Sequence, residues 1–361
     1  MRIFRNELTL NLALQGGGAH GAFTWGVLDR LLEDGSIGFG WISATSAGAV
    51  NAVALADGLA EGGRAGARDK LRALWEGVYK SGVPDLLRLN PFLYSLSRSS
   101  AMAQVASLWS PYEFNPLGFD PLRHILSETI NFDRLRRSAP VELLIAATEI
   151  ESGRARLFRS HELTIESVLA SACLPTMHHA VEIDGKAYWD GGFSANPDLV
   201  TLAGESPVRD TLIVQLNPTG KAGLPTGVRE IADHANRLTF NAPLLRDVEI
   251  IETAREAAAG SFGRLGLRGR LGRLVRHRFH HIEAGRYTGS LGPDSKIKPD
   301  WETFMYLHRS GRQEASKWLE MHGEDIGVRS SVDLKAQFLG DSVDDGAAHG
   351  HSGLAAGGAA S

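Results

Sequence analysis

Three short stretches of the chain hold residue types that together could carry out acyl transfer. Residues 16–21 (GGGAHG) form a glycine-rich turn, Ser46 stands among small residues, and Asp190 precedes two glycines. A serine hydroxyl can act as a nucleophile when a neighbouring base takes its proton. A carboxylate can be that base, and N–H groups of a tight backbone turn can stabilise the oxyanion that forms. The residue types therefore predict ester chemistry, provided that the fold brings the three stretches together.

The glycine turn lies between a β-favouring run and a helical pattern. Its glycines allow a sharp turn and a close approach of N–H groups to a ligand, and the following helix N-terminus adds partial positive charge. The spacing of Gly16, Gly18 and Gly21 also occurs in dinucleotide-binding folds. Those folds need an acidic residue about 20 residues further on, whereas the second strand ends in residues 41–45 (WISAT) without an acid. The turn favours an oxyanion, with a nucleotide-binding oxidoreductase as the competing interpretation.

Ser46 follows a predicted strand and precedes a predicted helix. A serine between small residues at such a turn is typical of the nucleophile elbow, G-x-S-x-G. Here Ala44 replaces the first glycine, while Ala47 and Gly48 follow the serine. The alternative is that the hydroxyl residues before the helix merely compete to cap it.

Asp190 ends a predicted strand and is followed by Gly191 and Gly192. A carboxylate in this position is exposed at the strand end, and the two glycines leave room for another backbone nearby. The alternative is a tight β-turn, for which Asp-Gly is a strong signal.

Periodic hydrophobic patterns predict the elements that must position these residues. Alternation of strands and helices predicts an α/β fold with a largely parallel sheet and crossover connections. The predicted strands are residues 8–14, 37–42, 142–150, 154–159, 186–190 and 211–216. The predicted helices are residues 20–33, 47–59, 229–259, broken or kinked at Pro243, and 301–322, which we expect to pack against the sheet.

The 361 residues can form one hydrolase domain over residues 1–340, followed by a disordered Gly/Ala-rich tail at 341–361. Residues 84–133 combine prolines with aromatic residues and predict a cap or lid insertion, or else a surface excursion with its own small core. The composition, 43% hydrophobic and 22% charged, is that of an ordinary globular protein. A formal net charge of −4 gives no electrostatic reason to expect nucleic acid.

The sequence shows neither a signal peptide nor a membrane-spanning run, and both bear on the expected cellular location. The first residues carry charge where a signal peptide needs an apolar stretch, and no apolar run approaches the ~18 residues that span a bilayer. The single cysteine, Cys173, excludes an intrachain disulfide and is expected to be a buried structural thiol. We expect a cytoplasmic enzyme that can contact membranes peripherally.

Taken together and in this order, the three motifs resemble those of the patatin-like phospholipases. Further stretches agree with this resemblance: residues 147–149 (ATE) with Gly153, 170–175 (ASACLP), Asn196 with Pro197, and 240–245 (FNAPLL), which is similar to bacterial members. The resemblance covers residues 8–245. It implies a three-layer α/β/α fold with a mostly parallel central sheet and a helical cap insertion. The family often has Arg or Lys where this chain has His20.

The resemblance also implies roles for the residues at the site. Ser46 and Asp190 would form a catalytic dyad that cleaves lipid acyl esters through an acyl-enzyme. The oxyanion hole would consist of Gly16, Gly17, Gly18 and Ala47, with the N–H groups of Gly17 and Gly18 as the donors and that of Ala47 as a helper. The remaining motif residues would shape the turns: Gly21, Ala44, Gly48, Gly191 and Gly192. No metal or cofactor is expected, since no His-Glu-x-x-His run or Cys/His cluster occurs.

Three alternatives remain open at this point. The first alternative is a catalytic histidine, because the chain has 13 histidines, including His178, His179, His280 and His281. Ala44 and His20 also keep open a catalytically weak or inactive protein that binds lipid or acts as a scaffold. Six arginines between Arg264 and Arg278 predict either an interfacial helix that contacts anionic lipid or a solvated basic loop. The lipid headgroup, the acyl length and the bond cleaved cannot be read from these patterns.

Overall fold

The computed structural model describes residues 8–81, 110–220, 224–259, 268–288 and 300–340. Its centre is an eight-stranded sheet with the order β5-β6-β3-β2-β1-β7-β8, and β4 also pairs with β3. Parallel pairs join β1 to β2 and β7, β2 to β3, and β7 to β8, whereas β4, β5 and β6 run antiparallel to their neighbours. The strands are β1 (Leu8–Leu14), β2 (Ile37–Thr45), β3 (Leu143–Glu149), β4 (Ala155–Arg159), β5 (Val181–Ile183), β6 (Lys186–Asp190), β7 (Asp210–Gln215) and β8 (Arg278–Glu283).

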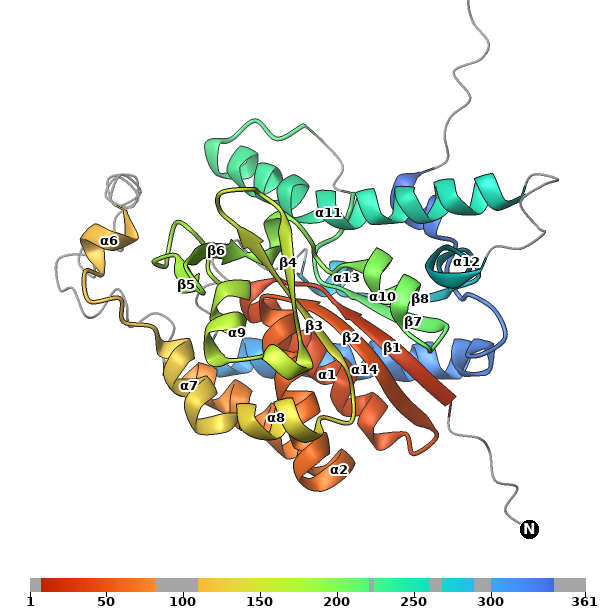
Figure 1. The fold of residues 1–361 in the computed structure, drawn as a ribbon, viewed down its shortest axis with the longest axis horizontal. Coiled ribbons are helices and arrows are strands. Elements are labelled where there is room, and N and C mark those ends of the chain that lie inside the picture. Colours follow the sequence, from red (N-terminus) through yellow and green to blue (C-terminus); the bar gives the residue numbers. More distant parts are fainter. Residues whose placement is uncertain (1–7, 82–109, 221–223, 260–267, 289–299, 341–361) are drawn as a thin grey trace, which may run out of the picture.

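Helices cover both faces of the sheet, which confirms the predicted three-layer α/β/α fold (Figure 1). One layer contains α1 (Gly21–Glu33), α2 (Ala47–Lys80), α7 (Pro121–Thr129), α8 (Phe132–Ser138), α9 (Ile165–Ser171) and α14 (Trp301–His322). The other contains α10 (Leu199–Glu205), α11 (Val228–Ala259) and α12 (Gly269–Val275). The short helices α6 (Pro111–Phe114) and α13 (Gly285–Thr288) complete the described set.

The central strands are buried on both faces because a helix layer covers each of them. In β1, Leu12 and Leu14 pack into the layer of α1 and α2, while Ala13 between them packs into the layer of α10 and α11. In β7, Leu212 and Ile213 divide in the same way. This is the period of two that a strand imposes on its side chains.

Helix α14 packs chiefly on α1, not directly on the sheet as the sequence predicted. The two helices meet at a pair of glycines. A Cβ atom on Gly26 would lie 2.0 Å from the His308 carbonyl oxygen, and one on Gly311 would lie 2.1 Å from the Phe23 carbonyl oxygen. Because neither position carries a side chain, the two backbones come close enough to bury Phe304 and Leu307 between α14 and its neighbours.

The remaining sequence predictions differ from the structure in a few places. Strands β5 and β8 were not predicted, and α2 continues to Lys80 with a kink at Gly62 and Gly63. Helix α11 continues through Pro243, so the predicted break there is wrong. Of the predicted insertion, residues 84–109 lie outside the described residues, as does the tail at 341–361, and α7 and α8 pack against α2. Across the described residues, no helix combines the length and apolarity that crossing a membrane requires.

The described part of the basic segment is neither one interfacial helix nor a free loop. Helix α12 ends at Val275 and β8 begins at Arg278. Arg270 pairs with Glu205, Arg273 donates to the Gly204 carbonyl, and Arg278 forms a two-bond ion pair with Asp210. These three arginines therefore contact neighbouring elements of the protein, and the contact of the basic segment with anionic lipid stays a prediction.

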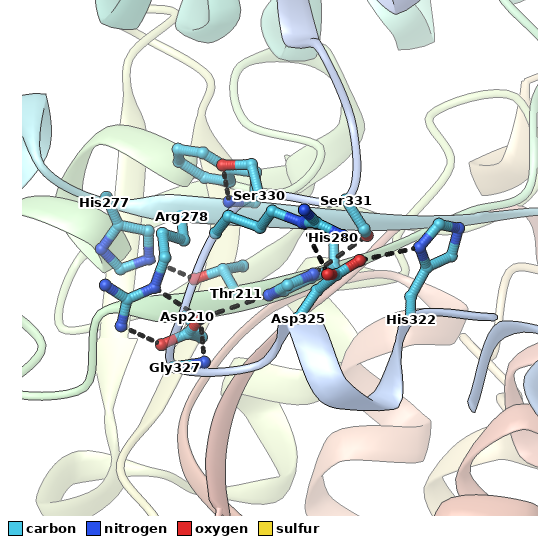
Figure 2. A network of polar contacts seen from close by, with 12 residues as sticks. Asp210, Thr211, His277, Arg278, His280, His322, Asp325, Gly327, Ser330 and Ser331 are labelled. Carbon is cyan, nitrogen blue, oxygen red and sulfur yellow. Dashed lines mark hydrogen bonds and ion pairs between the residues drawn. The ribbon is translucent and has the colours of Figure 1, made fainter. Parts of the chain in front are cut away.

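Figure 2 shows the polar network that Arg278 belongs to, at the start of β7 and β8. Asp210 accepts hydrogen bonds from Arg278, from the Gly327 N–H at 3.0 Å and from His280 at 3.3 Å. The other ring nitrogen of His280 contacts the Ser331 hydroxyl at 3.0 Å. Burial alone would raise the pKa of Asp210, but these hydrogen bonds outweigh it and hold the pKa well below its usual range. The network ties the segment after α14 to the amino ends of these two strands.

Candidate active site

Ser46 occupies a strained turn between β2 and α2. Its backbone has φ 54° and ψ −122°, in the left-handed range that residues other than glycine rarely adopt. Ser46 is half-buried, whereas residues 42–45 and 47–50 on either side of it are buried. The surrounding fold therefore holds Ser46 in a strained backbone conformation that exposes it within a buried segment. Such strain is associated with functional sites.

Close packing around the elbow explains its small residues. A Cβ atom on Gly48 would lie 2.2 Å from the Leu14 carbonyl oxygen, and one on Gly21 would lie 2.8 Å from the Ala47 Cβ. The Ser46 N–H donates to the Ser171 hydroxyl at 2.9 Å, so α9 fixes the elbow from the side. A larger residue at these positions would push α2 away from β1 and displace the serine.

The glycine turn lies directly against the elbow. A Cβ atom on Gly16 would come within 2.9 Å of the Ser46 Cβ, and Gly18 has a φ of 57° that favours glycine. The Gly16 N–H donates to the Asn196 side chain at 2.8 Å, so this N–H is already engaged, unlike a free oxyanion donor, which the sequence predicted Gly16 to be.

The N–H groups of Gly17 and Gly18 have no acceptor among the described residues. Gly17 is half-buried and Gly18 is exposed, so both can be reached from outside. Ala47 is the first residue of α2, and an N–H in the first turn of a helix has no acceptor within that helix. Ala47 directly follows Ser46, and Gly17 and Gly18 directly follow Gly16, which packs against the Ser46 Cβ.

Asp190 ends β6 in register with Ala147 of β3 and is 1% exposed. Its Oδ1 accepts the Gly192 N–H at 2.7 Å, while Oδ2 is buried without a hydrogen-bond partner. Burial raises the pKa of Asp190 to about 7, against the opposing effects of the Gly192 N–H and the nearby Ser46 hydroxyl. The hydroxyl thus lies close enough to affect the pKa of this carboxyl, although it is not within hydrogen-bond geometry of either Asp190 oxygen.

The two glycines after Asp190 are there for close packing. A Cβ atom on Gly191 would lie 2.2 Å from the Ala146 carbonyl oxygen, and one on Gly192 would lie 2.3 Å from the Phe240 ring. Residues Gly191–Phe193 form a 3₁₀ turn. The Ser194 N–H donates to the Gly191 carbonyl at 2.9 Å, so the chain turns tightly after Asp190, as the β-turn alternative also expects. Asp190 itself lies in register with Ala147 of β3.

A frame of buried side-chain amides, which the sequence did not predict, supports the glycine turn at Gly16. Gln15 accepts the N–H groups of Leu216 and Asn217, each at 2.8 Å, and donates to Asn241 at 3.0 Å. Asn217 donates to the Gly16 carbonyl at 2.9 Å. Asn196 and Asn241 were noticed as parts of matching stretches, but their partners lie too far away in the chain for spacing to reveal them.

The histidines named as alternatives occupy other places. His280 belongs to the network of Figure 2, and His281 contacts Gln215 at 2.8 Å. Burial lowers the pKa of His178 below its ordinary value and that of His281 to about 4. Among the described residues, the groups that shift the pKa of Asp190 include no histidine.

Cys173 is buried, and its sulfur lies 3.0 Å from the His179 carbonyl oxygen. Burial raises the pKa of this thiol to about 12, as expected for a structural cysteine. The described residues contain no group of three or more His, Cys, Asp or Glu side chains placed to hold a metal ion.

Comparisons with known proteins place these observations in a family. The sequence profile described as "Patatin-like phospholipase" matches residues 12–203. No curated protein matches the chain. Similar solved structures include VipD from Legionella pneumophila, with 15% identity over 88% of this chain and 67% of that one, and a TM-score of 0.39. The ExoU–SpcU complex of Pseudomonas aeruginosa gives 18% identity over 88% of this chain and 52% of that one, with a TM-score of 0.34.

The chain thus spans about two thirds of the length of VipD and about half of the length of the ExoU–SpcU neighbour. The sequence identities and TM-scores are too low for either neighbour to indicate the activity of this chain. The profile match, by contrast, covers more than half of this chain and includes the glycine turn, the elbow and the Asp190 turn. The chain belongs to the patatin-like phospholipase family, a family of lipid hydrolases.

Proposed function

We propose that this protein hydrolyses acyl esters of lipids with a two-residue centre, in which Ser46 is the nucleophile and Asp190 the base. The proposal is supported by two features: Ser46 is strained and half-buried, and its hydroxyl lies close enough to lower the pKa of the buried Asp190 carboxyl, one oxygen of which accepts no hydrogen bond. A catalytic base works best when its pKa is near the working pH. The pKa of Asp190, raised to about 7 by burial, meets that requirement.

In the proposed reaction, the Ser46 oxygen attacks the ester carbonyl carbon and the free oxygen of Asp190 takes the hydroxyl proton. Negative charge moves to the carbonyl oxygen, where the N–H groups of Gly17, Gly18 and Ala47 stabilise it. The C–O bond to the alcohol breaks, and Asp190 returns the proton to that alcohol. The fatty acyl group remains on Ser46 as an ester. Asp190 then takes a proton from a water molecule, which attacks the carbonyl carbon of this ester. The bond from that carbon to the Ser46 oxygen breaks, Asp190 returns the proton to Ser46, and the fatty acid is released.

The amide frame supports this assignment because it holds the donors still. Stabilisation of an oxyanion depends on donors that need no reorganisation when charge develops. Gln15, Asn196 and Asn217 together fix both backbone ends of the Gly16 turn through buried hydrogen bonds. One donor of this kind is typically worth about 10²–10³ in turnover.

Hydrolysis of a p-nitrophenyl acyl ester by the purified chain and its Ser46→Ala variant tests the proposal. We expect wild-type turnover and a loss of at least about 10³-fold in the variant. Ser43→Ala is the matched control, because Ser43 lies on β2 three residues before Ser46 and has a buried hydroxyl without a hydrogen-bond partner. Turnover that survives Ser46→Ala would refute the nucleophile. A wild-type chain that binds lipid without turnover would favour the inactive lipid-binding alternative.

A further inference from the structure

One buried hydroxyl contacts both ends of the turn that follows Asp190. Thr148 lies near the end of β3 and is 6% exposed. Its Oγ1 donates to the Asp190 carbonyl oxygen at 2.8 Å and lies 2.7 Å from the Ser194 Oγ. Asp190 and Ser194 flank the 3₁₀ turn Gly191–Phe193 on its two sides. A single side chain of β3 therefore joins the beginning of this turn to its end.

The direction of these two bonds follows from the number of hydrogens. A threonine hydroxyl has one hydrogen and two lone pairs, whereas a carbonyl oxygen can only accept. The hydrogen of Thr148 points to the Asp190 carbonyl, so the Ser194 hydroxyl must be the donor to Thr148. Because Ser194 is as buried as Thr148, water cannot easily replace either partner. The bonds thus form a chain with one direction, from Ser194 through Thr148 to Asp190.

The same turn carries the N–H group that binds the carboxylate. The Gly192 N–H donates to Asp190 Oδ1 at 2.7 Å. The Ser194 N–H donates to the Gly191 carbonyl at 2.9 Å and closes the turn around Gly192. The position of Gly192 relative to the carboxyl therefore depends on where the two ends of the turn are held, and Thr148 holds both of them.

We infer that Thr148 is a positioning residue for the proposed reaction, whose hydroxyl keeps Asp190 Oδ1 on the Gly192 N–H and leaves Oδ2 as the oxygen that takes the serine proton. The inference rests on the proposed function, because it requires Asp190 to be the base. Oδ2 is buried without a hydrogen-bond partner. The two oxygens of a carboxyl are equivalent until one of them is engaged, so a fixed Gly192 N–H is what distinguishes them. Thr148 acts through the Asp190 backbone and not on the carboxyl itself.

The hydroxyl of Thr148, and not its bulk, carries this role. Valine has nearly the same shape as threonine and suits a buried strand. Burial of a hydroxyl does not by itself demand two bonds in this protein, since Thr24 and Ser43 have buried hydroxyls without a hydrogen-bond partner among the described residues. The Asp190 N–H is held by the Cys173 carbonyl at 2.8 Å, a backbone bond that no side-chain change removes directly. The Thr148 hydroxyl is therefore the contact of the Asp190 backbone that a substitution can remove.

Ester hydrolysis by Thr148→Val and Thr148→Ser tests the inference. The kcat and KM for a dissolved p-nitrophenyl ester are measured from about pH 5 to about pH 9, together with denaturant unfolding of each variant. In Thr148→Val the turn can move away from β3, and Asp190 then loses the Gly192 bond that lowers its pKa. We expect kcat at neutral pH to fall at least about tenfold while KM stays within about twofold. The rise of kcat/KM with pH should move upward by about half a pH unit or more.

The conservative variant and a matched control separate the hydroxyl from general stability. Thr148→Ser keeps the hydroxyl and should bring kcat back to within about threefold of wild type, with the wild-type pH profile. Thr211→Val is the control, because Thr211 is a fully buried threonine of β7 whose hydroxyl lies 2.7 Å from His277, within the network of Figure 2. We expect it to lower the unfolding midpoint as Thr148→Val does, but to keep the wild-type kcat and pH profile.

Two results would overturn the inference. One is a wild-type kcat and pH profile in folded Thr148→Val, and the other is a folded Thr148→Ser that does not restore turnover. If Thr148→Val does not fold, Ser194→Ala decides, because it releases the far end of the turn and leaves the bond from Thr148 to Asp190 in place. An upward shift of its pH profile supports the inference, and an unmoved profile overturns it.

Ser46→Ala, assayed alongside, separates this inference from the proposed function. Hydrolysis that survives in Ser46→Ala defeats the proposed function. Hydrolysis that depends on Ser46 but has wild-type kinetics in Thr148→Val defeats only the role of Thr148.

Discussion

The Gly16 N–H donates to the Asn196 Oδ1 at 2.8 Å, although the two residues are 180 positions apart. Asn196 is fully buried, and its Nδ2 donates to the Phe240 carbonyl at 2.8 Å. One side chain therefore links the glycine turn, the segment after Asp190 and α11. The position of the proposed oxyanion donors depends on this link as much as on the glycines.

Replacement of Asn196 should damage the site more than the fold. Asn196→Ala leaves a buried N–H and a buried carbonyl without partners, and we expect a loss of about 2–4 kcal/mol in the free energy of unfolding. Turnover of the folded protein should fall at least about tenfold, since the Gly16 turn can shift. Denaturant unfolding and ester hydrolysis measure the two effects.

Asn11→Ala is the matched control for that change. Asn11 is also fully buried and bonds to Val208, Trp41 and Ser206, away from the elbow. We expect a comparable loss of stability with turnover per folded molecule retained. Equal effects of the two variants on turnover would show that Asn196 has no special role in the site.

A methyl group at Gly48 should break the elbow. In Gly48→Ala the new Cβ would lie 2.2 Å from the Leu14 carbonyl oxygen, so β1 and α2 must separate. We expect a cost of about 2–4 kcal/mol and a large loss of turnover. Gly62→Ala in the same helix has no heavy atom within 4 Å of the new Cβ and should change stability by less than about 1 kcal/mol. Similar unfolding midpoints for the two variants would contradict the packing account.

Turnover should depend on the ionisation of Asp190. Because the carboxylate form accepts the proton and its pKa is about 7, kcat/KM should rise about tenfold per pH unit below 7 and level off above it. Ionisation of Asp190 should raise turnover but lower the free energy of unfolding. A carboxyl whose pKa is raised in the folded state costs stability as pH rises from about 4 to 7, so Asp190→Asn should be more stable than wild type at pH 8. If kcat/KM instead levelled off above about pH 4, the buried environment that raises the pKa of Asp190 would be contradicted.

The network of Figure 2 should govern acid stability and leave catalysis alone. Asp210→Ala leaves the half-buried Arg278 and the buried His280 without their carboxylate partner and should cost about 3 kcal/mol in the free energy of unfolding at pH 7. Since the pKa of Asp210 is lowered on folding, its contribution is present above about pH 4 and is lost as pH falls below that value. Between pH 7 and pH 3, the free energy of unfolding should therefore fall more steeply for the wild type than for Asp210→Ala. Denaturant unfolding at several pH values measures this.

Two further variants complete this comparison. Glu256→Ala removes the exposed ion pair with Lys335 and should change stability by less than about 0.5 kcal/mol. His280→Gln should keep turnover, because His280 lies in the network with Asp210 and not at the elbow. Loss of turnover in folded His280→Gln would revive the catalytic-histidine alternative.

Local patterns in the sequence predicted most of the sheet and the placement of the three motifs at strand ends. Strands 8–14 and 186–190 match β1 and β6 residue for residue, because apolar runs bounded by glycines are strong local signals. Strand β8 was hidden by its charged and histidine-rich sequence, since Arg278 and His280 are stabilised by Asp210 rather than by apolar burial.

The support of the site could not be predicted in the same way. Ser171, Asn196 and Gln15 act through contacts with residues 125 to 202 positions away, and spacing carries no signal at that range. The contacts of Thr148 with Asp190 and Ser194 likewise span 42 and 46 positions, and only tertiary structure establishes them.

The rate at which Ser46 reacts with a fluorophosphonate, followed by mass spectrometry of the modified peptide, tests the central claim most directly. We predict an adduct on Ser46 alone, formed faster as pH rises through about 7 in the wild-type chain, and suppressed at least about 10²-fold in folded Asp190→Asn. An adduct on another residue, or an unchanged rate in Asp190→Asn, would contradict the account.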